Sequence, residues 1–431
     1  MLNNIFVRKK ILIYGLGISG NSCLSFLKKK NDIKVFDDNY SLKNNFNKNL
    51  FIKKNEITKL KFDYIVLSPG IDIQKCDLKK YLKKNFSRII TELDIFHINY
   101  PNNIKITITG TNGKSTTCQM LYNIFKLKNL DVRLVGNIGK SPLKEKNIKK
   151  KTIFIVEASS YQIFYNKYFK ADYAAILNLN IDHLERHRNF NNYAKAKIKL
   201  ISDQDKGKLS LIENDSHIIN KLILNKNIKS KIIKINYNKI VFFKKHIKNE
   251  YLLDKNNLNN IHFVYEISKI FRISDVKIFS SLNLFKGLKF RKQIIYNKSN
   301  LKIINDSKST SFSSTNGLLK TYRNIYWIVG GLFKKGDKFI LEKKYYKNIN
   351  AYIIGLNKDY FIKQFKNKIK FRYMKNLKNA ILAIKDDIKE DNYKKIILFS
   401  PAAASFDQFK NFEQRGNSFN FLIKKISFYG K

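Results

Sequence analysis

Short runs of β-branched and other apolar residues recur along the chain, and they alternate with stretches in which apolar residues return every three or four positions. The first pattern is typical of buried strands and the second of amphipathic helices, so their alternation predicts parallel sheets covered by helices. Most of these runs end beside Gly, Ser, Asn or Asp, where α/β proteins bind ligands. The predicted strands cover residues 11–14, 33–36, 64–67, 104–109, 153–157, 174–179, 303–305, 325–329, 351–354 and 396–400.

The length of the chain, 431 residues, predicts two or three domains at about 150 residues per domain. With only 4 prolines and no Gly/Ser-rich stretch, the sequence offers no obvious flexible linker. Domain boundaries are therefore expected where a new sheet begins, near residues 97 and 288. The sequence thus predicts an α/β protein of three domains.

The formal net charge of +51, taken alone, would indicate a nucleic-acid or anionic-membrane partner. The lysines, however, are spread along the whole chain among Asn, Ile, Phe and Tyr, instead of gathering in one arm or one helix. These residue types share A/T-rich codons, so we attribute the charge to genome composition. No recognition motif accompanies it, and we expect no specific nucleic-acid partner.

No apolar run approaches the roughly 18 residues of a membrane span, so we expect no membrane insertion. The basic first residues, 1–10, lead into a short apolar run that Gly15 and Gly17 end before it reaches the length of a signal-peptide core. Cys23, Cys76 and Cys118 stand too far apart for a metal site or a disulfide framework. These features predict a cytoplasmic protein, which we expect to be a monomer.

The strand at 104–109 leads into a compact loop and then into an amphipathic helix from Ser115 onward. Backbone N–H groups at a helix N-terminus, together with a cation, bind phosphates, so we expect Lys114 to reach the β- and γ-phosphates and Ser115 to bind Mg²⁺. The loop is shorter than the common GxxxxGK[ST] form, and a glycine-containing surface turn is the alternative. The loop consists of Gly110, Thr111, Asn112, Gly113, Lys114, Ser115 and Thr116.

A second glycine-rich turn, GLGISG at 15–20, follows the first strand, and Asp37 lies about 20 residues beyond it at the end of the next strand. By itself this spacing predicts NAD binding, which makes an NAD-dependent oxidoreductase the competing interpretation. The same geometry can hold any diphosphate, including that of a UDP-sugar. A tight turn without a ligand is the third possibility.

Polar side chains follow two further strands of the predicted central sheet. Glu157 ends the strand at 153–157 and could bind Mg²⁺, although the segment could equally begin a helix capped by Ser159 or Ser160. His183 lies in a polar segment after the strand at 174–179, where it could be a metal or substrate ligand or an ordinary histidine.

Two similar clusters follow strands in the last third of the chain. The segment 305–310 contains Asp306 and Lys308 among hydroxyls and suits ribose and phosphate contacts, although Lys308 alone would be an ordinary solvated lysine. The segment 400–409 is rich in small residues and could let a substrate approach the backbone closely. Its alternative is a helix start capped by Ser405, with Asp407 in the first turn.

Taken in order, these segments resemble the Mur ligase family nearly from end to end. The segment NDSKST and the last matching segment favour the family member that adds D-glutamate. The matching segments are GLGISG at 15–20, SPGI at 68–71, TGTNGKST at 109–116, GNIG at 136–139, EASSYQ at 157–162, DHLERH at 182–187, NDSKST at 305–310, GG at 330–331 and SPAAASFDQFKNFEQRG at 400–416.

The resemblance implies an ATP-dependent carboxylate-amine ligase of peptidoglycan synthesis, which adds D-glutamate to UDP-N-acetylmuramoyl-L-alanine through an acyl phosphate. It implies two Mg²⁺ ions and a lysine carbamylated by CO₂. The domains it implies are a Rossmann-like UDP-sugar-binding domain (1–97), a central P-loop ATPase-type domain with a mostly parallel sheet that binds ATP (98–287), and a Rossmann-like C-terminal domain that binds the incoming amino acid (288–431).

The resemblance also implies a role for individual residues. Those implied for the UDP-sugar are Ile18, Ser19, Asp37 and Gly70, and those for the muramoyl-alanine part are Asn137 and His183. Those implied for Mg²⁺ are Ser115, Glu157, His183 and Lys197, the last as the carbamate, with neighbouring Lys195 as the alternative. Those implied for ATP, beside the phosphate loop, are Asn257, Arg291, Asp306 and Lys308. Those implied for D-glutamate are Thr310, Lys334, Ser405, Phe406 and Phe412. The catalytic set is Lys114, His183, Lys197 and Lys308.

The sequence departs from the family pattern near the adenine and at the start of the third domain. Asn256 stands where relatives usually carry His, Lys289 and Phe290 replace a usual Pro-His pair, and Ser311 replaces a common Asn. Three alternatives remain open at this point: a Mur-type ligase for another amino acid, the NAD-dependent oxidoreductase, and a nucleotide-binding protein without catalysis.

Overall fold

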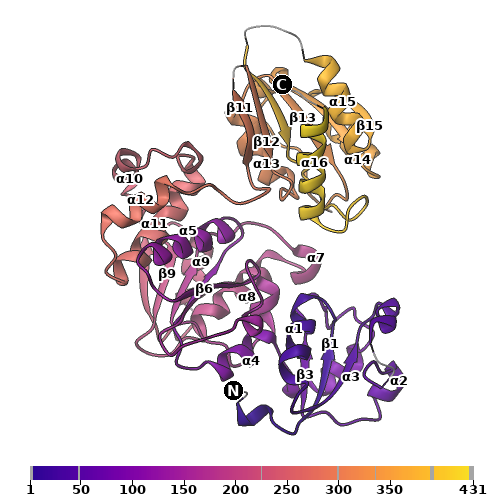
Figure 1. Cartoon of the computed structure of the whole chain (residues 1–431), viewed down its shortest axis with the longest axis vertical. Helices are drawn as coiled ribbons and strands as arrows, with labels where there is room; N and C mark the ends of the chain where they lie inside the picture. The colour runs from indigo at the N-terminus through magenta and orange to yellow at the C-terminus, as the bar shows by residue number, and fades with distance from the viewer. Residues whose placement is uncertain are drawn as a thin grey trace. The chain divides into compact units, whose positions relative to one another are not determined.

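The computed structural model describes residues 3–46, 49–224, 226–298, 300–334, 336–388 and 393–426. It divides into two compact units, Met1–Phe285 and Lys286–Lys431. Within the described residues, the first unit contains a four-stranded and a six-stranded sheet, and the second contains another six-stranded sheet (Figure 1). The predicted three-domain α/β fold is confirmed.

The first sheet, drawn in indigo in Figure 1, has the strand order β2-β1-β3-β4 and is parallel throughout. The apolar run 11–14 is fully buried because helices cover the sheet, as the continuous hydrophobic pattern predicts. Its strands are β1 (Lys10–Tyr14), β2 (Asp32–Phe36), β3 (Tyr64–Leu67) and β4 (Ile89–Ile90). Its helices are α1 (Ile18–Leu27), α2 (Lys54–Ile57), α3 (Lys79–Lys84) and α4 (Glu92–Asn99).

The second sheet has the order β10-β9-β8-β5-β7-β6, also all parallel. Because β5 lies between β8 and β7, the ends of these three strands bring their following segments to one edge. The strands are β5 (Lys105–Thr109), β6 (Val132–Gly136), β7 (Ile153–Glu157), β8 (Tyr173–Ile176), β9 (Leu209–Glu213) and β10 (Lys231–Ile235). The helices are α5 (Lys114–Leu127), α6 (Ser160–Phe164), α7 (Leu184–His187), α8 (Phe190–Ser202), α9 (His217–Leu224), α10 (Ile240–His246), α11 (Lys255–Ile270) and α12 (Asp275–Asn283).

The sheet of the second unit has the order β11-β12-β16-β13-β14-β15, in which only the β11–β12 pair is antiparallel. Trp327 of β13 is fully buried in its core and donates from Nε1 to the carbonyl of Ser400, 2.7 Å away. The strands are β11 (Gln293–Lys298), β12 (Leu301–Asn305), β13 (Ile325–Gly330), β14 (Ile349–Ile354), β15 (Lys370–Lys375) and β16 (Lys395–Phe399). The helices are α13 (Phe312–Thr321), α14 (Lys358–Phe365), α15 (Leu377–Asp387) and α16 (Phe412–Ile426).

The strands that the hydrophobic pattern predicts are all present, with shifts of a few residues at their ends. Several strands that it does not predict are short or partly exposed: β4 has two residues, and β10, β11 and β15 carry lysines and exposed positions. An edge strand needs only one buried face, so its apolar signal is weak.

The first and second sheets are joined within the first unit through buried polar groups. The boundary expected near residue 97 falls inside α4, whose Asp94 is fully buried and accepts hydrogen bonds from the backbone of residues 167–169. Glu92, at the start of the same helix, accepts a hydrogen bond from Ser141 of the second sheet's domain. Among the described residues, no helix combines the length and apolar character that crossing a bilayer requires.

Candidate active site

The predicted phosphate loop connects β5 to α5. Gly113 is the N-cap of α5 with φ +84°, a backbone conformation that favours glycine. A Cβ there would lie 2.3 Å from Oδ1 of Asn260 on α11, so both the conformation and the packing require glycine. The prediction of an amphipathic helix from Ser115 is confirmed, because α5 begins at Lys114 and buries Ser115 and Thr116.

The loop is held from the other side by Asn178, which follows β8. The backbone N–H of Asn112 donates to Oδ1 of Asn178 at 2.8 Å, and Nδ2 of Asn178 donates back to the carbonyl of Asn112 at 3.1 Å. The hydroxyl of Thr111 lies 3.0 Å from that of Tyr193. Sequence reasoning gave no role to Asn178 or Tyr193. The predicted strand ran to residue 179 and included Asn178, whereas β8 ends at Ile176.

Two lysines meet at the start of this loop. Nζ of Lys114 donates to the carbonyl oxygens of Gly110 and Thr111, each at 2.8 Å. Nζ of Lys197, which reaches in from α8, donates to the same Gly110 oxygen at 2.9 Å and to Oγ1 of Thr109 at 3.2 Å. Burial lowers the pKa of Lys197 well below its usual value, and the charge of Lys114 lowers it further. The neighbouring Lys195 is exposed, so the structure distinguishes the two lysines clearly.

Glu157 ends β7 beside this loop and is almost fully buried. Its Oε1 accepts from Nδ2 of Asn137 at 2.8 Å, whereas its Oε2 has no hydrogen-bond partner among the described residues. A buried carboxylate oxygen without a partner is costly, so it is suited to a ligand with positive charge. The proposed helix start is also present, since Ser159 caps α6.

His183 is the N-cap of the short helix α7 and has φ +54°. Its Nδ1 lies 2.9 Å from the hydroxyl of Tyr161 and 3.3 Å from Oε1 of Glu185, and its Nε2 lies 3.3 Å from Oδ2 of Asp182. Both ring nitrogens therefore face polar groups. Across the described residues, no three His, Cys, Asp or Glu side chains gather as a metal site.

The glycine-rich turn of the first sheet lies between β1 and α1. Gly15 has φ +93°, and a Cβ there would lie 2.6 Å from Cβ of Ser68. Oδ2 of Asp37 accepts from the backbone N–H of Leu16 at 2.7 Å, so this carboxylate supports the turn itself. Ile18, the first residue of α1, is 79% exposed, which is unusual for an isoleucine and suits contact with a ligand.

Two other residues expected to bind the nucleotide-sugar lie nearby in the first sheet's domain. Ser19 is in the first turn of α1. Burial raises the pKa of Glu92, and the hydroxyls of Ser141 and Ser19 oppose that rise. Gly70 follows β3, and its carbonyl accepts from Nη1 of Arg186 at 3.3 Å.

Asn257 is a buried residue in the first turn of α11. Its Nδ2 donates to the carbonyl of Tyr251 and to Oδ2 of Asp254, both at 2.7 Å. Both amide hydrogens are thus used within the protein, and Oδ1 is the group that could accept from an adenine amine. Asn256, the departure from the usual His, is exposed next to it.

In the second unit, Asp306 follows β12 and is buried. Its Oδ1 accepts from the backbone N–H of Lys292 at 3.0 Å, and its Oδ2 accepts from Oγ of Ser400 at 2.8 Å. Burial raises the pKa of Asp306 to about 6, although these hydrogen bonds and the charge of Arg291 favour the ionised form. Asp306 is therefore brought together with segments after β16 and before β11.

The residues expected to contact D-glutamate lie in segments after β12, β13 and β16. Nζ of Lys308 lies 3.6 Å from the centre of the Phe412 ring, a cation–π contact. Ser405 is buried, whereas Phe406 is 70% exposed. The alternative of a helix start at Ser405 is wrong, because the next helix, α16, begins at Phe412. The remaining members are Thr310, which is half-buried after β12, and Lys334, which follows β13.

Arg415 of α16 connects two of these segments and received no role from the sequence. Its guanidinium is buried and donates to Oγ and the carbonyl of Ser307 at 3.1 and 2.7 Å, and to the carbonyl of Ala403 at 3.0 Å. The segment after β12 and the segment after β16 are thereby fixed to each other. No signal in the sequence indicated this role, because the burial of Arg415 arises only when α16 packs in the folded protein.

The departures from the family pattern have clear structural consequences in the second unit. Phe290 has φ +61° and is buried against α16, where a Cβ on Gly416 would lie 2.3 Å from its ring. Lys289 is exposed. Ser311 caps α13, a position for which serine and asparagine are similarly suited.

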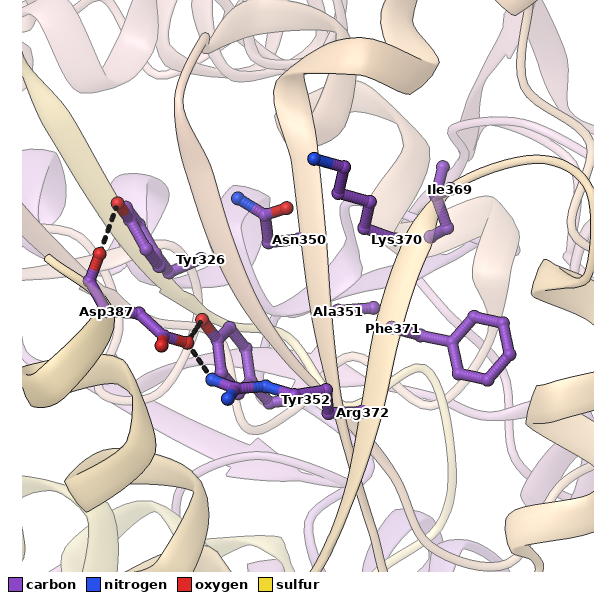
Figure 2. Close-up of a pocket in the computed structure, with 9 residues that line it drawn as sticks. All are labelled: Tyr326, Asn350, Ala351, Tyr352, Ile369, Lys370, Phe371, Arg372 and Asp387. Atoms are coloured by element: carbon purple, nitrogen blue, oxygen red, sulfur yellow. Dashed lines mark hydrogen bonds and ion pairs between the residues drawn. The ribbon is translucent and has the colours of Figure 1, made fainter.

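A cavity of about 620 Å³ lies near the amino ends of β13, β14 and β15 (Figure 2). In Figure 2, Asp387 contacts Tyr326, Tyr352 and Arg372 through its carbonyl and carboxylate. The predicted site residues of this unit follow the carboxyl ends of β12, β13 and β16, except Arg291, which precedes β11, and none of them lines this cavity.

Comparisons with known proteins match the chain nearly from end to end. The model of the Mur ligase MurD-like N-terminal domain matches residues 9–90, and that of the Mur ligase middle domain matches residues 108–285. The UDP-N-acetylmuramoylalanine--D-glutamate ligase of Rickettsia bellii is 34% identical, over 98% of this chain and 99% of that one. The ligase of the same name from Rickettsia prowazekii is also 34% identical, over 98% and 99% of the two chains. The chain belongs to the Mur ligase family.

The fold of this Mur ligase agrees with solved structures. MurF of Thermotoga maritima, determined in complex with ADP, superposes with a TM-score of 0.58 at 14% identity, covering 99% of this chain and 98% of that chain. The expectation of an ATP-dependent ligase is confirmed, and the family favours a ligase over the NAD-dependent oxidoreductase.

Proposed function

We propose that this protein uses ATP to join the amine of D-glutamate to the carboxylate of UDP-N-acetylmuramoyl-L-alanine, in peptidoglycan synthesis. The observation that carries this proposal is the 34% identity to the Rickettsia bellii ligase of that specificity over 98% of the chain. The shape of the phosphate loop, with two lysines at the carbonyl of Gly110, supports the use of a nucleoside triphosphate.

The reaction has two chemical steps. A carboxylate oxygen of the L-alanine part attacks the γ-phosphorus of ATP, and ADP leaves, which gives an acyl phosphate. The amine of D-glutamate then attacks the acyl carbon, and the tetrahedral intermediate expels phosphate and loses a proton to form the amide. Lys114 would stabilise the negative charge on the transferring phosphoryl group. A cation held in a fixed position there interacts more strongly with the charge that develops in the transition state than with the ground state.

Mg²⁺ would be held beside the phosphate loop by oxygen ligands, which this ion prefers. The unpartnered buried Oε2 of Glu157 fits a cation, and the hydroxyl of Ser115 at the start of α5 lies on the same loop. Lys197, if carbamylated by CO₂, would supply a second carboxylate beside that of Glu157, and His183 would be the remaining ligand. Bound Mg²⁺ would neutralise phosphate charge.

The substrates would be divided among the three domains, 1–97, 98–287 and 288–431. The first would bind the UDP-sugar through Ile18, Ser19, Asp37 and Gly70, and Asn137 and His183 would contact the muramoyl-alanine part. ATP would be bound by the loop Gly110, Thr111, Asn112, Gly113, Lys114, Ser115 and Thr116, with Asn257, Arg291, Asp306 and Lys308. D-Glutamate would be bound by Thr310, Lys334, Ser405, Phe406 and Phe412. We further propose that the enzyme acts as a monomer in the cytoplasm.

A direct test is to incubate the purified protein with ATP, Mg²⁺, UDP-N-acetylmuramoyl-L-alanine and one amino acid at a time. D-Glutamate should release phosphate and give a product heavier by one glutamyl residue, whereas L-glutamate, L-lysine and diaminopimelate should not. Product with L-lysine or diaminopimelate alone would contradict the assigned specificity. No turnover with any amino acid would favour a nucleotide-binding protein without catalysis.

The oxidoreductase alternative has its own test, a fluorescence titration with NADH in the presence and absence of UDP. The proposed function predicts no tight NADH binding. Tight binding that UDP does not displace would contradict the uridine assignment of the glycine-rich turn.

A further inference from the structure

Helix α7 carries an arginine that reaches from the second sheet's domain to the loop after β3 in the first. Nη2 of Arg186 donates to the carbonyls of Pro69 and Ile71 at 3.3 and 2.5 Å, and Nη1 donates to the carbonyl of Gly70 at 3.3 Å. One guanidinium thus binds three successive carbonyls of a loop more than a hundred residues away in the chain. No other hydrogen bond of Arg186 competes among those described.

The loop that Arg186 holds is itself fixed to the glycine-rich turn. Oγ of Ser68 donates to the carbonyl of Gly15 at 2.6 Å, and the backbone N–H of Ile71 donates to the carbonyl of Ser68 at 3.0 Å. Gly15 and Ser68 are so close that no Cβ fits on the glycine. Arg186 therefore fixes, through residues 68–71, both segments at the carboxyl ends of β1 and β3.

On its other side, the guanidinium lies on two aromatic rings, 5.2 Å from the centre of Tyr161 and 5.5 Å from that of Tyr165. The hydroxyl of the same Tyr161 lies 2.9 Å from Nδ1 of His183. Tyr161 thus contacts Arg186 with its ring face and His183 with its oxygen. The ring nitrogens of His183 and the loop after β3 are connected by two side chains.

We infer that Arg186 and Tyr161 are positioning residues that fix the UDP-sugar loop at 68–71 relative to His183, so that the bound substrate directs its carboxylate to the phosphate loop. The assignment of substrate to these segments rests on the proposed function. Neither residue touches the reacting atoms. The physical reason is geometric, because a reacting group misplaced by about 1 Å can lose roughly a hundredfold in rate.

The chemistry of the contact requires arginine. Three carbonyls in different directions need a planar group with several fixed donors, and a lysine ammonium presents a single compact centre. Guanidinium groups also stack on aromatic faces better than ammonium groups do. Arg186→Lys should therefore keep only part of the function, and Arg186→Met should lose it.

The test compares Arg186→Met, Arg186→Lys and Tyr161→Phe with the parent, and uses Arg188→Met as the matched control. Arg188 is exposed two residues further on. Calorimetry without ATP measures the dissociation constant for UDP-N-acetylmuramoyl-L-alanine. Phosphate release gives kcat and the KM for ATP. Mass spectrometry measures hydrogen exchange in peptides that cover residues 68–73.

Arg186→Met should weaken UDP-substrate binding about tenfold or more, lower kcat, and speed exchange at residues 68–73, with KM for ATP within about twofold of the parent. Arg186→Lys should give values of affinity, kcat and exchange rate between those of the parent and of Arg186→Met. The Arg188→Met control should match the parent. Tyr161→Phe keeps the ring under the guanidinium and removes the hydroxyl from His183. It should lower kcat and leave the UDP-substrate affinity unchanged.

The inference would be overturned if Arg186→Met kept parental UDP-substrate affinity and exchange, or if it changed binding of ATP and UDP-substrate equally through a general loss of folding. Lack of turnover in the parent would contradict the proposed function instead. In that case the exchange measurement still tests whether Arg186 fixes the loop, because it needs no substrate.

Discussion

Lys114 and Lys197 donate to the same acceptor, the carbonyl oxygen of Gly110, at 2.8 and 2.9 Å. Two ammonium groups this close repel each other, and burial of Lys197 strengthens the effect. Two changes relieve the repulsion: arrival of polyanionic ATP, or conversion of one lysine into a negative carbamate. The pair thus predicts both what this loop binds and which lysine is open to modification.

Replacement of Lys114 by Met should lower kcat by about 10²- to 10³-fold or more, since one charged donor to the transition state is lost. Nζ of Lys114 donates to the carbonyls of Gly110 and Thr111, and the loss of these hydrogen bonds should lower the melting temperature modestly. Phosphate-release kinetics and thermal denaturation measure the two effects. Lys128→Met, at the exposed C-cap of the same helix, should behave as the parent, and comparable activity in the two variants would refute the role of Lys114.

Removal of bicarbonate should lower activity, and its return should restore it, because the proposed Mg²⁺ site includes a carbamate on Lys197. The buried ammonium is disfavoured by lost hydration and by Lys114, so a larger fraction is neutral and able to react with CO₂. Protein in ¹³C-bicarbonate should show a carbamate carbon by NMR. The signal should disappear in Lys197→Met and persist in Lys195→Met, the exposed neighbour; the reverse pattern would transfer the assignment to Lys195.

Asp306 should make folding stability depend on pH, because burial raises its pKa to about 6. Between the unfolded value of about 4 and this folded value, the folded state binds more protons, so the free energy of unfolding falls as pH rises. The loss of unfolding free energy caused by ionising the buried Asp306 is absent below a pH of about 4 and complete above the folded pKa of about 6. Asp306→Asn should therefore gain roughly 2–3 kcal/mol relative to the parent between about pH 4 and pH 7.

Urea denaturation of parent and variant across this pH range measures that gain in unfolding free energy. Subtracting the two values removes the contributions of the carboxyl groups that both proteins contain. Asp359→Asn removes an exposed carboxyl in α14 and should show no comparable gain. A constant difference between Asp306→Asn and the parent at all pH values would contradict the prediction.

A side chain at position 416 should destabilise the fold, since a Cβ on Gly416 would lie 2.3 Å from the Phe290 ring. Gly416→Ala should cost about 1–3 kcal/mol of unfolding free energy, the usual range for overpacking. Gly317→Ala, on α13 where a Cβ meets open space, should instead be neutral or stabilising by about 0.5–1 kcal/mol. Phe290→His shortens the ring and should reduce the cost of Gly416→Ala; equal costs in both backgrounds would show that Phe290 is not the obstacle.

Much of the site could be predicted because its residues follow buried strands. The continuous apolar runs that form β5, β7 and β12 specify where strands end, so the sequence indicates that Lys114, Glu157 and Asp306 lie at sheet edges. The choice of Lys197 over Lys195 came from family spacing alone. The local pattern of apolar and polar residues could not distinguish the two lysines, because both lie on one helix in a chain that is rich in lysine.

Contacts between distant segments were outside the reach of sequence reasoning. Asn178 holding Asn112, Arg415 joining Ser307 to Ala403, and Arg186 holding residues 69–71 all depend on how strands are ordered within the sheets. The order β10-β9-β8-β5-β7-β6 places β8 next to β5, although two strands and two α-helices (α5, β6, β7 and α6) separate them in the chain. Strand order is a global property, and no local pattern of apolar residues encodes it.

The sequence by itself determined the α/β class, the positions of most buried strands, the phosphate loop and the family, because each depends on residues close together in the chain. Only the tertiary structure decided that Lys114 and Lys197 share the carbonyl of Gly110, and that Glu157 keeps a buried oxygen without a partner among the described residues. Burial and distance between side chains arise when sheets and helices pack, and these quantities set the charge and the pKa of each group.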